Sequence, residues 1–219
     1  KGMLDKYTLD EISAVFGAPM EDENHSLLAC QTALEIKRRT CRPPLDRLGY
    51  PNNPVFNVPI GIDTNSIIQG AIETPLRSDF MVLGDPVDQA SRLANICRYS
   101  RTSIIVSRRT LTGIGHLFYI RELGRIMEKG TSRPLEIYEL LGDIDAGPLA
   151  TSLNDMIEEY AEGLRAFYKR DFILAYSRFN KLWTEYVDTP SRILLNQTEK
   201  YLAEAPDDSW GGEINIFQQ

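Results

Sequence analysis

The sequence has few of the residues from which disulfide scaffolds, metal cages and catalytic triads are built. It contains three cysteines, an odd number without a CxxC pair, and two widely separated histidines, His25 and His116. A disulfide framework, a histidine-based metal site and a Ser-His-Asp triad are therefore not predicted. A reducing cytoplasm is the expected compartment, either for a free protein or for the cytoplasmic part of a membrane-anchored one.

Long apolar runs and glycine-rich phosphate loops are also missing. No run approaches the ~18 to 20 apolar residues that cross a bilayer. Neither GxxxxGK[ST] nor a GxGxxG motif after a strand occurs. What is present is the composition of a globular protein, 42% apolar and 25% charged over 219 residues. This is enough chain for one domain with an appendage and a well-buried core.

The net charge of −7 is concentrated near the end of the chain. Residues 143–219 hold 7 of the 24 basic and 14 of the 31 acidic residues, so residues 1–142 are balanced. Residues 92–133 hold nine basic side chains and two acidic ones, which indicates either a polyanion-binding face or a solvated basic face. Nucleic acid is not an expected partner, because aromatic side chains do not interleave with these basic ones as in an RNA-binding platform.

The first 142 residues alternate short β-rich runs with amphipathic segments, which predicts an α+β domain. Helices are expected at residues 22–39 and after Pro86, where proline suits the first turn. A hairpin-like stretch is expected over residues 7–16 and a loop over the proline-rich residues 41–54. Strands are expected at 55–62 and 67–69, as a pair, and at 80–83, 103–106, 118–123 and 135–140.

Beyond a boundary at residues 143–152, the chain is predicted to be wholly helical. Periodic segments cover residues 153–168, 172–186 and 190–203. Gly163, Ala175 and Phe179 have the spacing at which paired helices of a tetratricopeptide repeat touch. One such unit cannot bury its apolar face alone, so the segment 153–219 is expected to dock on its own domain or on a protein partner.

Several short motifs follow one another in the first domain. Lys6 and Asp10 precede an apolar strand that ends Phe-Gly-Ala-Pro. A Gly-Ile-Asp-Thr strand comes next, followed by the segment RSDFMVLGDPVDQASRL, which begins at Arg77. Asp88 and Arg92 are four residues apart in that segment and therefore share one face of the expected helix. A Leu-Gly-x4-Lys-Gly hairpin completes the series.

In this order and spacing the motifs resemble those of the class III nucleotidyl cyclases. The resemblance covers residues 2–141 and implies a ferredoxin-like cyclase fold that lacks its first strand and helices, with the C-terminal helical extension of bacterial members. It also implies conversion of ATP to cyclic AMP and pyrophosphate by two-metal catalysis with Mg²⁺ or Mn²⁺. Homodimers, or heterodimers with another cyclase domain, would share each active site. The family's first metal-binding aspartate would lie upstream of Lys1, so this chain alone is expected to be inactive.

The resemblance also assigns roles to single residues. Asp10 matches the second metal-binding aspartate, Lys6 the lysine that reads the purine, and Arg92 the arginine that stabilises the transition state. Arg77 matches an arginine that faces the phosphates. Met81 replaces a residue that hydrogen-bonds the adenine, and a thioether is only a weak acceptor.

Two further departures from the family pattern bear on activity. Asp88 replaces the asparagine that orients the ribose, which adds negative charge beside a triphosphate. Leu9 replaces the glycine before the second aspartate. Three hypotheses therefore stay open at this point: an active adenylate cyclase domain, a degenerate cyclase fold that serves as a regulatory or dimerisation partner, and a helical tail that carries the function by binding another protein.

Overall fold

A computed structural model describes residues 2–40, 57–74, 77–127, 134–214 and 216, with the side chains of residues 71–83 left aside. The predicted loop at 41–54 lies outside the described residues. A four-stranded mixed sheet forms the centre, in the order β3-β6-β8-β7. Its strands are β3 (Ile60–Ile62), β6 (Ile104–Ser107), β7 (Phe118–Met127) and β8 (Pro134–Asp143). Only β3 and β6 are parallel; the other neighbours are antiparallel.

Two helices cover opposite faces of this sheet because successive residues of β6 point in opposite directions. Ile104 and Val106 pack in a cluster with Cys30 and Ala33 of α1 (His25–Thr40). Ile105 packs in a second cluster with residues of α2 (Asp85–Ser100). The predicted helix starts are confirmed to within a few residues, with Pro86 in the first turn of α2.

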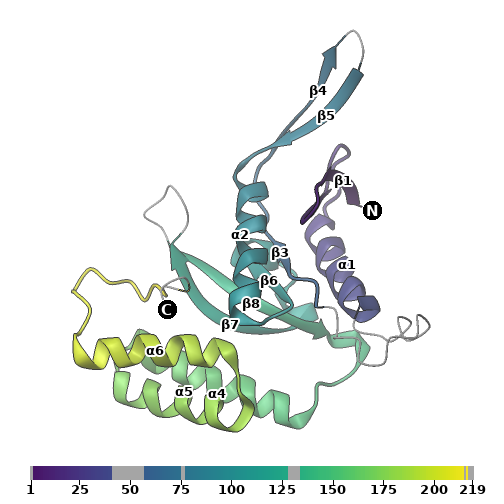
Figure 1. The fold of residues 1–219 in the computed structure, drawn as a ribbon. Coiled ribbons are helices and arrows are strands. Elements are labelled where there is room, and N and C mark those ends of the chain that lie inside the picture. Colours follow the sequence, from purple (N-terminus) through teal and green to yellow (C-terminus); the bar gives the residue numbers. More distant parts are fainter. Residues whose placement is uncertain (1, 41–56, 75–76, 128–133, 215, 217–219) are drawn as a thin grey trace.

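Two antiparallel hairpins form separate small sheets. The first joins β1 (Gly2–Tyr7) to β2 (Ile12–Phe16), as the hairpin-like pattern indicated. The second joins β4 (Ile68–Thr74) to β5 (Arg77–Leu83) and projects as an arm beyond the N-terminal end of α2 (Figure 1). The expected pairing of residues 55–62 with 67–69 is therefore wrong. β3 instead pairs with β6. Parallel strands are joined by a long crossover, so the partner of β3 lies far along the chain and was not predicted from the runs next to it.

The rest of the domain consists of short connections and the start of the tail. α3 (Arg108–Leu111) and a 3₁₀ turn at Gly115–Leu117 link β6 to β7. The segment predicted as a linker, 143–152, contains the last residue of β8, a 3₁₀ turn at Ile144–Ala146 and the start of the next helix. Among the described helices, none is both long and apolar enough to cross a membrane.

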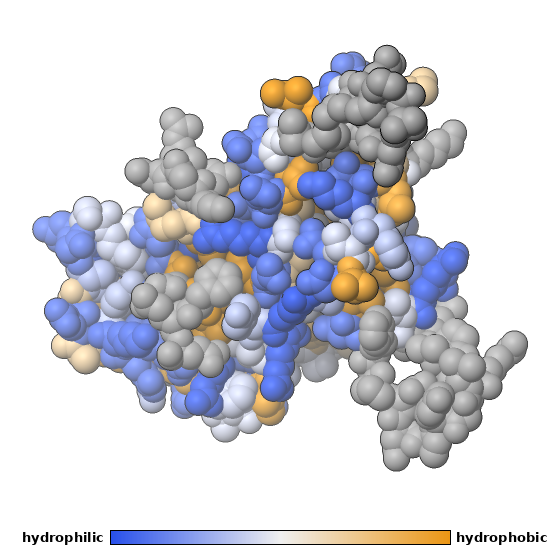
Figure 2. Space-filling view, turned by 45° about the horizontal axis from the view of Figure 1, so that its top comes forward, coloured by the Kyte–Doolittle hydropathy of each residue, from blue (hydrophilic) through white to orange (hydrophobic). Residues whose placement is uncertain are grey.

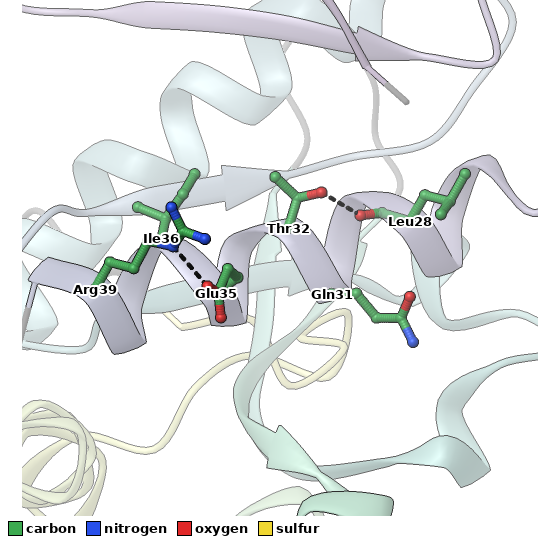
Figure 3. A pocket seen from close by; sticks show the side chains of 6 residues that line it. All are labelled: Leu28, Gln31, Thr32, Glu35, Ile36 and Arg39. Atoms are coloured by element: carbon green, nitrogen blue, oxygen red, sulfur yellow. Dashed lines mark hydrogen bonds and ion pairs between the residues drawn. The ribbon is translucent and has the colours of Figure 1, made fainter.

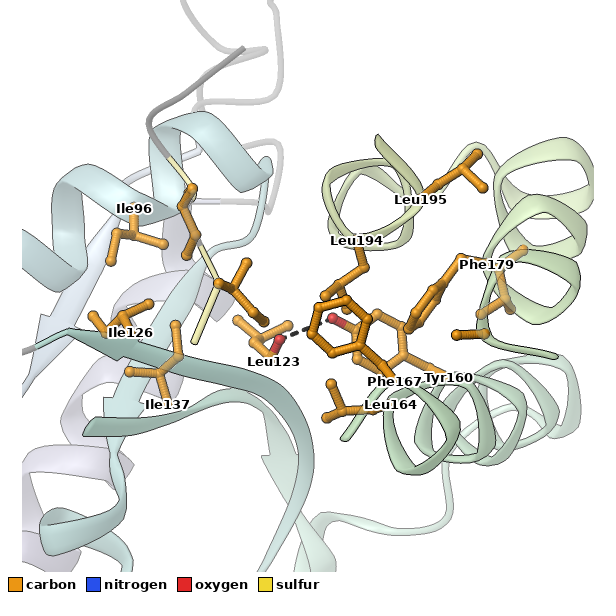
Figure 4. Packing of buried hydrophobic residues seen from close by; sticks show 14 of the residues in the cluster. Ile96, Leu123, Ile126, Ile137, Tyr160, Leu164, Phe167, Phe179, Leu194 and Leu195 are labelled. Carbon is orange, nitrogen blue, oxygen red and sulfur yellow. Dashed lines mark hydrogen bonds between the residues drawn. The ribbon is translucent and has the colours of Figure 1, made fainter. Parts of the chain in front are cut away.

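Three helices follow, at the bounds that the periodicity predicts to within two residues: α4 (Thr151–Tyr168), α5 (Phe172–Tyr186) and α6 (Thr189–Ala203). The predicted contact between paired helices is confirmed, since a Cβ on Gly163 would lie 2.9 Å from the Phe179 ring. The likeness to a tetratricopeptide repeat stays a prediction. The tail docks on its own domain. Figure 4 shows Leu123, Ile126 and Ile137 of the sheet facing Tyr160, Leu164 and Leu194 of the helices.

A buried ion-pair network lies where the tail meets the sheet. The Arg121 guanidinium on β7 donates to Glu139 of β8 and, at 2.9 Å, to Asp188 at the start of α6. Its side chain is 4% exposed and lies over the Tyr160 ring, 4.9 Å from the ring centroid. Asp188 also caps α6 by accepting the backbone N–H and the hydroxyl of Ser191. One arginine thus holds two strands and one helix of the tail together.

The buried phenol of Tyr160 should make this interface less stable at high pH. Its hydroxyl donates to the Leu123 carbonyl at 3.0 Å, and burial raises the pKa of the phenol well above its usual range. The stability that this neutral phenol contributes is complete below pH 10, where unfolded tyrosine is also neutral, and is lost as the pH rises further. Above pH 10 this single group should lower the free energy of unfolding by about 1.4 kcal/mol per pH unit.

Denaturant unfolding of the wild type and of Tyr160→Phe at pH 7, 9, 10 and 11 measures this effect. The variant should lose about 1 kcal/mol at pH 7 because the hydrogen bond is gone. It should then fall less steeply than the wild type between pH 10 and 11. Equal slopes for the two proteins would show that the Tyr160 phenol ionises normally in the folded state.

Candidate functional site

The turn of the first hairpin presents two acidic side chains. Residues 8–11 close the turn, with the Thr8 N–H donating to the Glu11 carbonyl at 2.9 Å. The Thr8 hydroxyl lies 3.1 Å from the Asp10 carboxylate and accepts the Glu11 N–H at 3.1 Å. A side-chain oxygen that binds nearby backbone in this way holds a turn rigid. Asp10 is therefore fixed at an exposed tip.

Lys6 lies on the same hairpin, near the end of β1. The pairing of β1 with β2 shifts register between Leu4 and Lys6, and the backbone N–H of Lys6 donates to the Ser13 hydroxyl at 3.1 Å. A bulge of this kind changes the direction of a side chain relative to its neighbours. The Lys6 side chain is exposed, as a residue that meets a ligand from solution must be.

Helix α2 brings its predicted residues to the same region. Gly84, with φ +152°, precedes the helix and allows the sharp turn out of β5. Asp88 is exposed in the first turn, and Arg92 lies one turn later, half-buried. The Arg92 guanidinium donates to the backbone carbonyl of Met127, at the end of β7, at 2.6 Å. Within the described residues no ion pair joins Asp88 to Arg92.

A hydrogen bond joins the hairpin to the helix. The Ser91 hydroxyl of α2 donates to the Glu11 carboxylate of the turn at 2.8 Å, across 80 residues of sequence. It places the turn that carries Asp10 against the helix that carries Asp88 and Arg92. Glu11, Ser91 and Met127 were not predicted as site residues. For Glu11 and Ser91 the sequence offered one signal, that they are next to Asp10 and Arg92. For the Met127 carbonyl it offered none.

Arg77 and Met81, the other two predicted residues, lie on β5, and Met81 faces Gly70 in the register of the arm. Their side chains lie outside the described part of the structure. The structure therefore brings Asp10, Asp88 and Arg92 to one region with Lys6 on the same hairpin. The placement of Arg77 and Met81 toward a nucleotide stays a prediction.

A metal ion at this site would take its predicted protein ligand from the exposed Asp10. In the part of the chain that the structure describes, no three His, Cys, Asp or Glu side chains converge on one point. Mg²⁺ in nucleotide sites is commonly bound through one or two carboxylates together with substrate phosphates. The exposed Asp10 carboxylate suits that mode as a single ligand; it accepts one hydrogen bond from the Thr8 hydroxyl, as the neighbouring Glu11 carboxylate does from Ser91.

A shallow surface hollow of about 360 Å³ lies along α1, lined by Leu28, Gln31, Thr32, Glu35, Ile36 and Arg39 (Figure 3). None of the predicted site residues lines it. Hydrogen bonds from Arg38 and Arg39 lower the pKa of Glu35 to about 2, so three of the charged side chains along this part of α1 pair with one another. On the face that Figure 2 shows, hydrophobic residues form small separate patches among hydrophilic ones.

The sequence is similar to those of known adenylate cyclases. The chain is 28% identical over 149 residues to "Adenylate cyclase 1" of Rhizobium meliloti, a match that covers 66% of this chain and 22% of that protein. It is 27% identical over 204 residues to the terminal-differentiation-specific adenylate cyclase of Dictyostelium discoideum, covering 90% of this chain and 9% of that protein. The chain thus spans less than a quarter of either relative. No family model matches the sequence.

Solved structures show the same fold. The adenylyl cyclase CyaB of P. aeruginosa superposes with a TM-score of 0.53 at 25% identity, covering 65% of this chain and 72% of that one. The GTP complex of the guanylate cyclase domain of RhGC from Catenaria anguillulae has a TM-score of 0.50 at 21% identity, covering 65% and 73%. The chain therefore contains a domain with the α+β fold of the class III adenylyl and guanylyl cyclases.

Proposed function

We propose that this domain converts ATP to cyclic AMP and pyrophosphate, in intracellular signalling, at a site shared between two cyclase domains. The observation that carries the proposal is the contact between Ser91 and Glu11, which sets the turn bearing Asp10 against the helix bearing Arg92 on a cyclase fold. ATP is chosen because the curated relatives are named adenylate cyclases. The cytoplasm is the proposed compartment, since both described cysteines, Cys30 and Cys97, are free.

In the proposed reaction the ribose 3′ oxygen attacks the α-phosphorus, the bond from that phosphorus to the β-phosphate oxygen breaks, and pyrophosphate leaves. The 3′ hydroxyl proton passes to solvent or to a nearby base. Charge develops on the phosphate oxygens, and the planar fork of Arg92 is suited to bind them. Asp10 would supply a carboxylate ligand to Mg²⁺ or Mn²⁺, which when bound neutralises the triphosphate. Lys6 and Met81 would contact the base, Asp88 the ribose and Arg77 the phosphates.

The exposed side of the first hairpin supports a two-domain assembly. Leu4, Tyr7, Leu9 and Ile12 are 62%, 76%, 108% and 63% exposed. Apolar side chains gathered on one short hairpin are typical of an interaction surface. A guanylyl cyclase domain of similar fold from Blastocladiella emersonii is described as a non-canonical dimer. We therefore propose a second copy, or another cyclase domain, as the partner at this hairpin. A protein partner of the helical tail stays a separate prediction.

The direct test measures cyclic nucleotide formation by the natural polypeptide that contains these residues, offered ATP and GTP separately with Mn²⁺. Asp10→Ala should lower the rate at least about 100-fold, because a charge-stabilising group is lost from the transition state. Glu21→Ala removes another exposed carboxylate outside the turn and should leave the rate unchanged. Product formation that survives Asp10→Ala would remove Asp10 from the site, and product from GTP alone would change the substrate.

A cyclase fold without activity is the second candidate. It is favoured by Leu9 and Asp88, two exposed residues that depart from the family pattern beside the proposed metal ligand and the proposed transition-state arginine. In that case ATP with Mn²⁺ would leave the melting temperature unchanged in a folded, dimeric protein. The pair Met81→Thr with Asp88→Asn should then restore nucleotide binding if these substitutions alone removed it. A wild type that forms product excludes this candidate.

A further inference from the structure

Residues 210–214, near the C-terminus, form a strap along β7. The Ile214 N–H donates to the Arg125 carbonyl at 2.7 Å, and Glu213 forms a parallel bridge with Arg125. The Arg125 guanidinium returns a hydrogen bond to the Gly211 carbonyl at 3.1 Å. The Trp210 ring stacks edge-on against Phe167, with ring centroids 5.2 Å apart. The strap is therefore bound to the sheet at one end and to the helical tail at the other.

Gly124 makes room for the strap. A Cβ on Gly124 would lie 2.0 Å from Ile214 Cδ1, and the residue has φ +130°, a backbone conformation that glycine adopts easily. Ile214 is 6% exposed and belongs to the main core cluster. The Ile214 side chain thus fills a place that the backbone of β7 leaves open. The contact therefore depends on the glycine at position 124 and on the isoleucine at position 214.

Arg92 binds the same edge of β7 two residues further on. β7 ends the described sheet order, so one of its edges carries no neighbouring described strand. Carbonyls of residues i and i+2 on a strand point to the same side. The Arg125 carbonyl accepts the strap and the Met127 carbonyl accepts the Arg92 guanidinium at 2.6 Å. The strap and the Arg92 side chain therefore bind the same edge of β7. The strap holds in place the strand segment that accepts the hydrogen bond from Arg92.

We propose that Ile214 and its strap are positioning elements for Arg92, so that the C-terminal segment sets the geometry of the proposed cyclisation without touching the nucleotide. The inference rests on the proposed function. An arginine side chain has high rotamer entropy, and ordering it requires a rigid partner. If the strap is loosened, the end of β7 has an unpaired edge, and the Met127 carbonyl no longer holds the guanidinium in one place.

The experiment compares Ile214→Ala with Ile214→Val and with Leu202→Ala in the natural polypeptide. Leu202 is a 46% exposed residue of α6 outside the strap, so Leu202→Ala removes an aliphatic side chain from the tail without opening the core. Ile214→Ala should lower kcat about 10- to 100-fold while KM for ATP changes less than about twofold, because misplacement of a transition-state group affects chemistry more than binding. Ile214→Val should restore most of kcat, and Leu202→Ala should not change it.

Two further readouts separate positioning from simple loss of structure. In an Arg92→Lys background, Ile214→Ala should cost much less than in the wild type, because residues that act as one unit are non-additive. The NMR signal of the Arg92 Nε–H should broaden or shift in Ile214→Ala but not in Leu202→Ala, and this signal needs no activity. If the wild type forms no product, the proposed function fails, and the NMR comparison alone judges the strap. Equal effects of Ile214→Ala with either residue at position 92, or an unchanged Arg92 signal, would overturn the proposal.

Discussion

Replacing Arg121 by methionine is expected to lower the free energy of unfolding by about 3 to 5 kcal/mol. The substitution leaves Glu139 and Asp188 in their buried positions without the cation that neutralises them; their side chains are 10% and 8% exposed. Burial lowers the pKa of the Arg121 guanidinium, but the charges of Glu139 and Asp188 outweigh this and raise the pKa. The loss of stability therefore comes more from the two buried carboxylates left without a cation than from the missing arginine contacts.

Denaturant unfolding at pH 7 measures this effect, and a second variant tests the reason. The combination Arg121→Met, Glu139→Leu and Asp188→Asn removes all three charges while the asparagine can still cap α6. It should recover most of the stability, because a buried ion network can be replaced by uncharged side chains of similar volume. A triple variant no more stable than Arg121→Met would mean that the network itself, and not the uncompensated charge, contributes the stability.

Replacing Gly61 by alanine should cost about 3 kcal/mol or more, an unusually large penalty for one methyl group. Gly61 is the central residue of β3, where α2 crosses the strand. A Cβ at this position would lie 2.0 Å from the Ala90 carbonyl oxygen and 2.4 Å from the Ala94 nitrogen. These are backbone atoms of a helix, which cannot rotate away as a side chain can. The helix would have to move as a body, and its packing against Ile105 would be lost.

Gly70→Ala is the matched control, because a Cβ there would meet nothing within 4 Å. It should change the melting temperature by no more than about 2 °C, whereas Gly61→Ala should lower it by about 10 °C or more. Thermal unfolding followed by circular dichroism distinguishes the two. Since α2 also carries Ser91, a helix displaced by Gly61→Ala would disturb the hydrogen bond between Ser91 and Glu11. A stable Gly61→Ala variant would show that α2 and β3 can separate at little cost.

The helices could be predicted from the sequence because their signals are local. Pro86 at the start of α2, and the spacing of apolar residues in the three tail helices, place these elements within a few residues of their observed ends. Strand pairing is not local. The pairing of β3 with β6 is not predictable from the sequence, because nothing near Ile60 indicates that its partner is Ile104, which follows the β4–β5 arm and α2 in the chain.

The candidate site follows the same division. Lys6 and Asp10 could be placed on one hairpin, and Asp88 and Arg92 on one helix face, since each pair is separated by only four residues. The contacts that join these pieces were not predictable. Glu11 meets Ser91, and Arg92 meets the Met127 carbonyl, only because the chain folds back over 80 and 35 residues. A backbone carbonyl, moreover, has no signature in a sequence.

The core shared by α2, the sheet and the tail helices means that the chain should unfold in a single cooperative transition. Leu93 and Ile96 belong to the same cluster of buried residues as Phe167 and Leu194. The most protected amides of the tail and of the central sheet should therefore exchange hydrogen with one common opening free energy, that of global unfolding. Separating the chain near Gly142 would expose that cluster on both fragments, so a recombination event that divides it there would yield two unstable pieces instead of two modules.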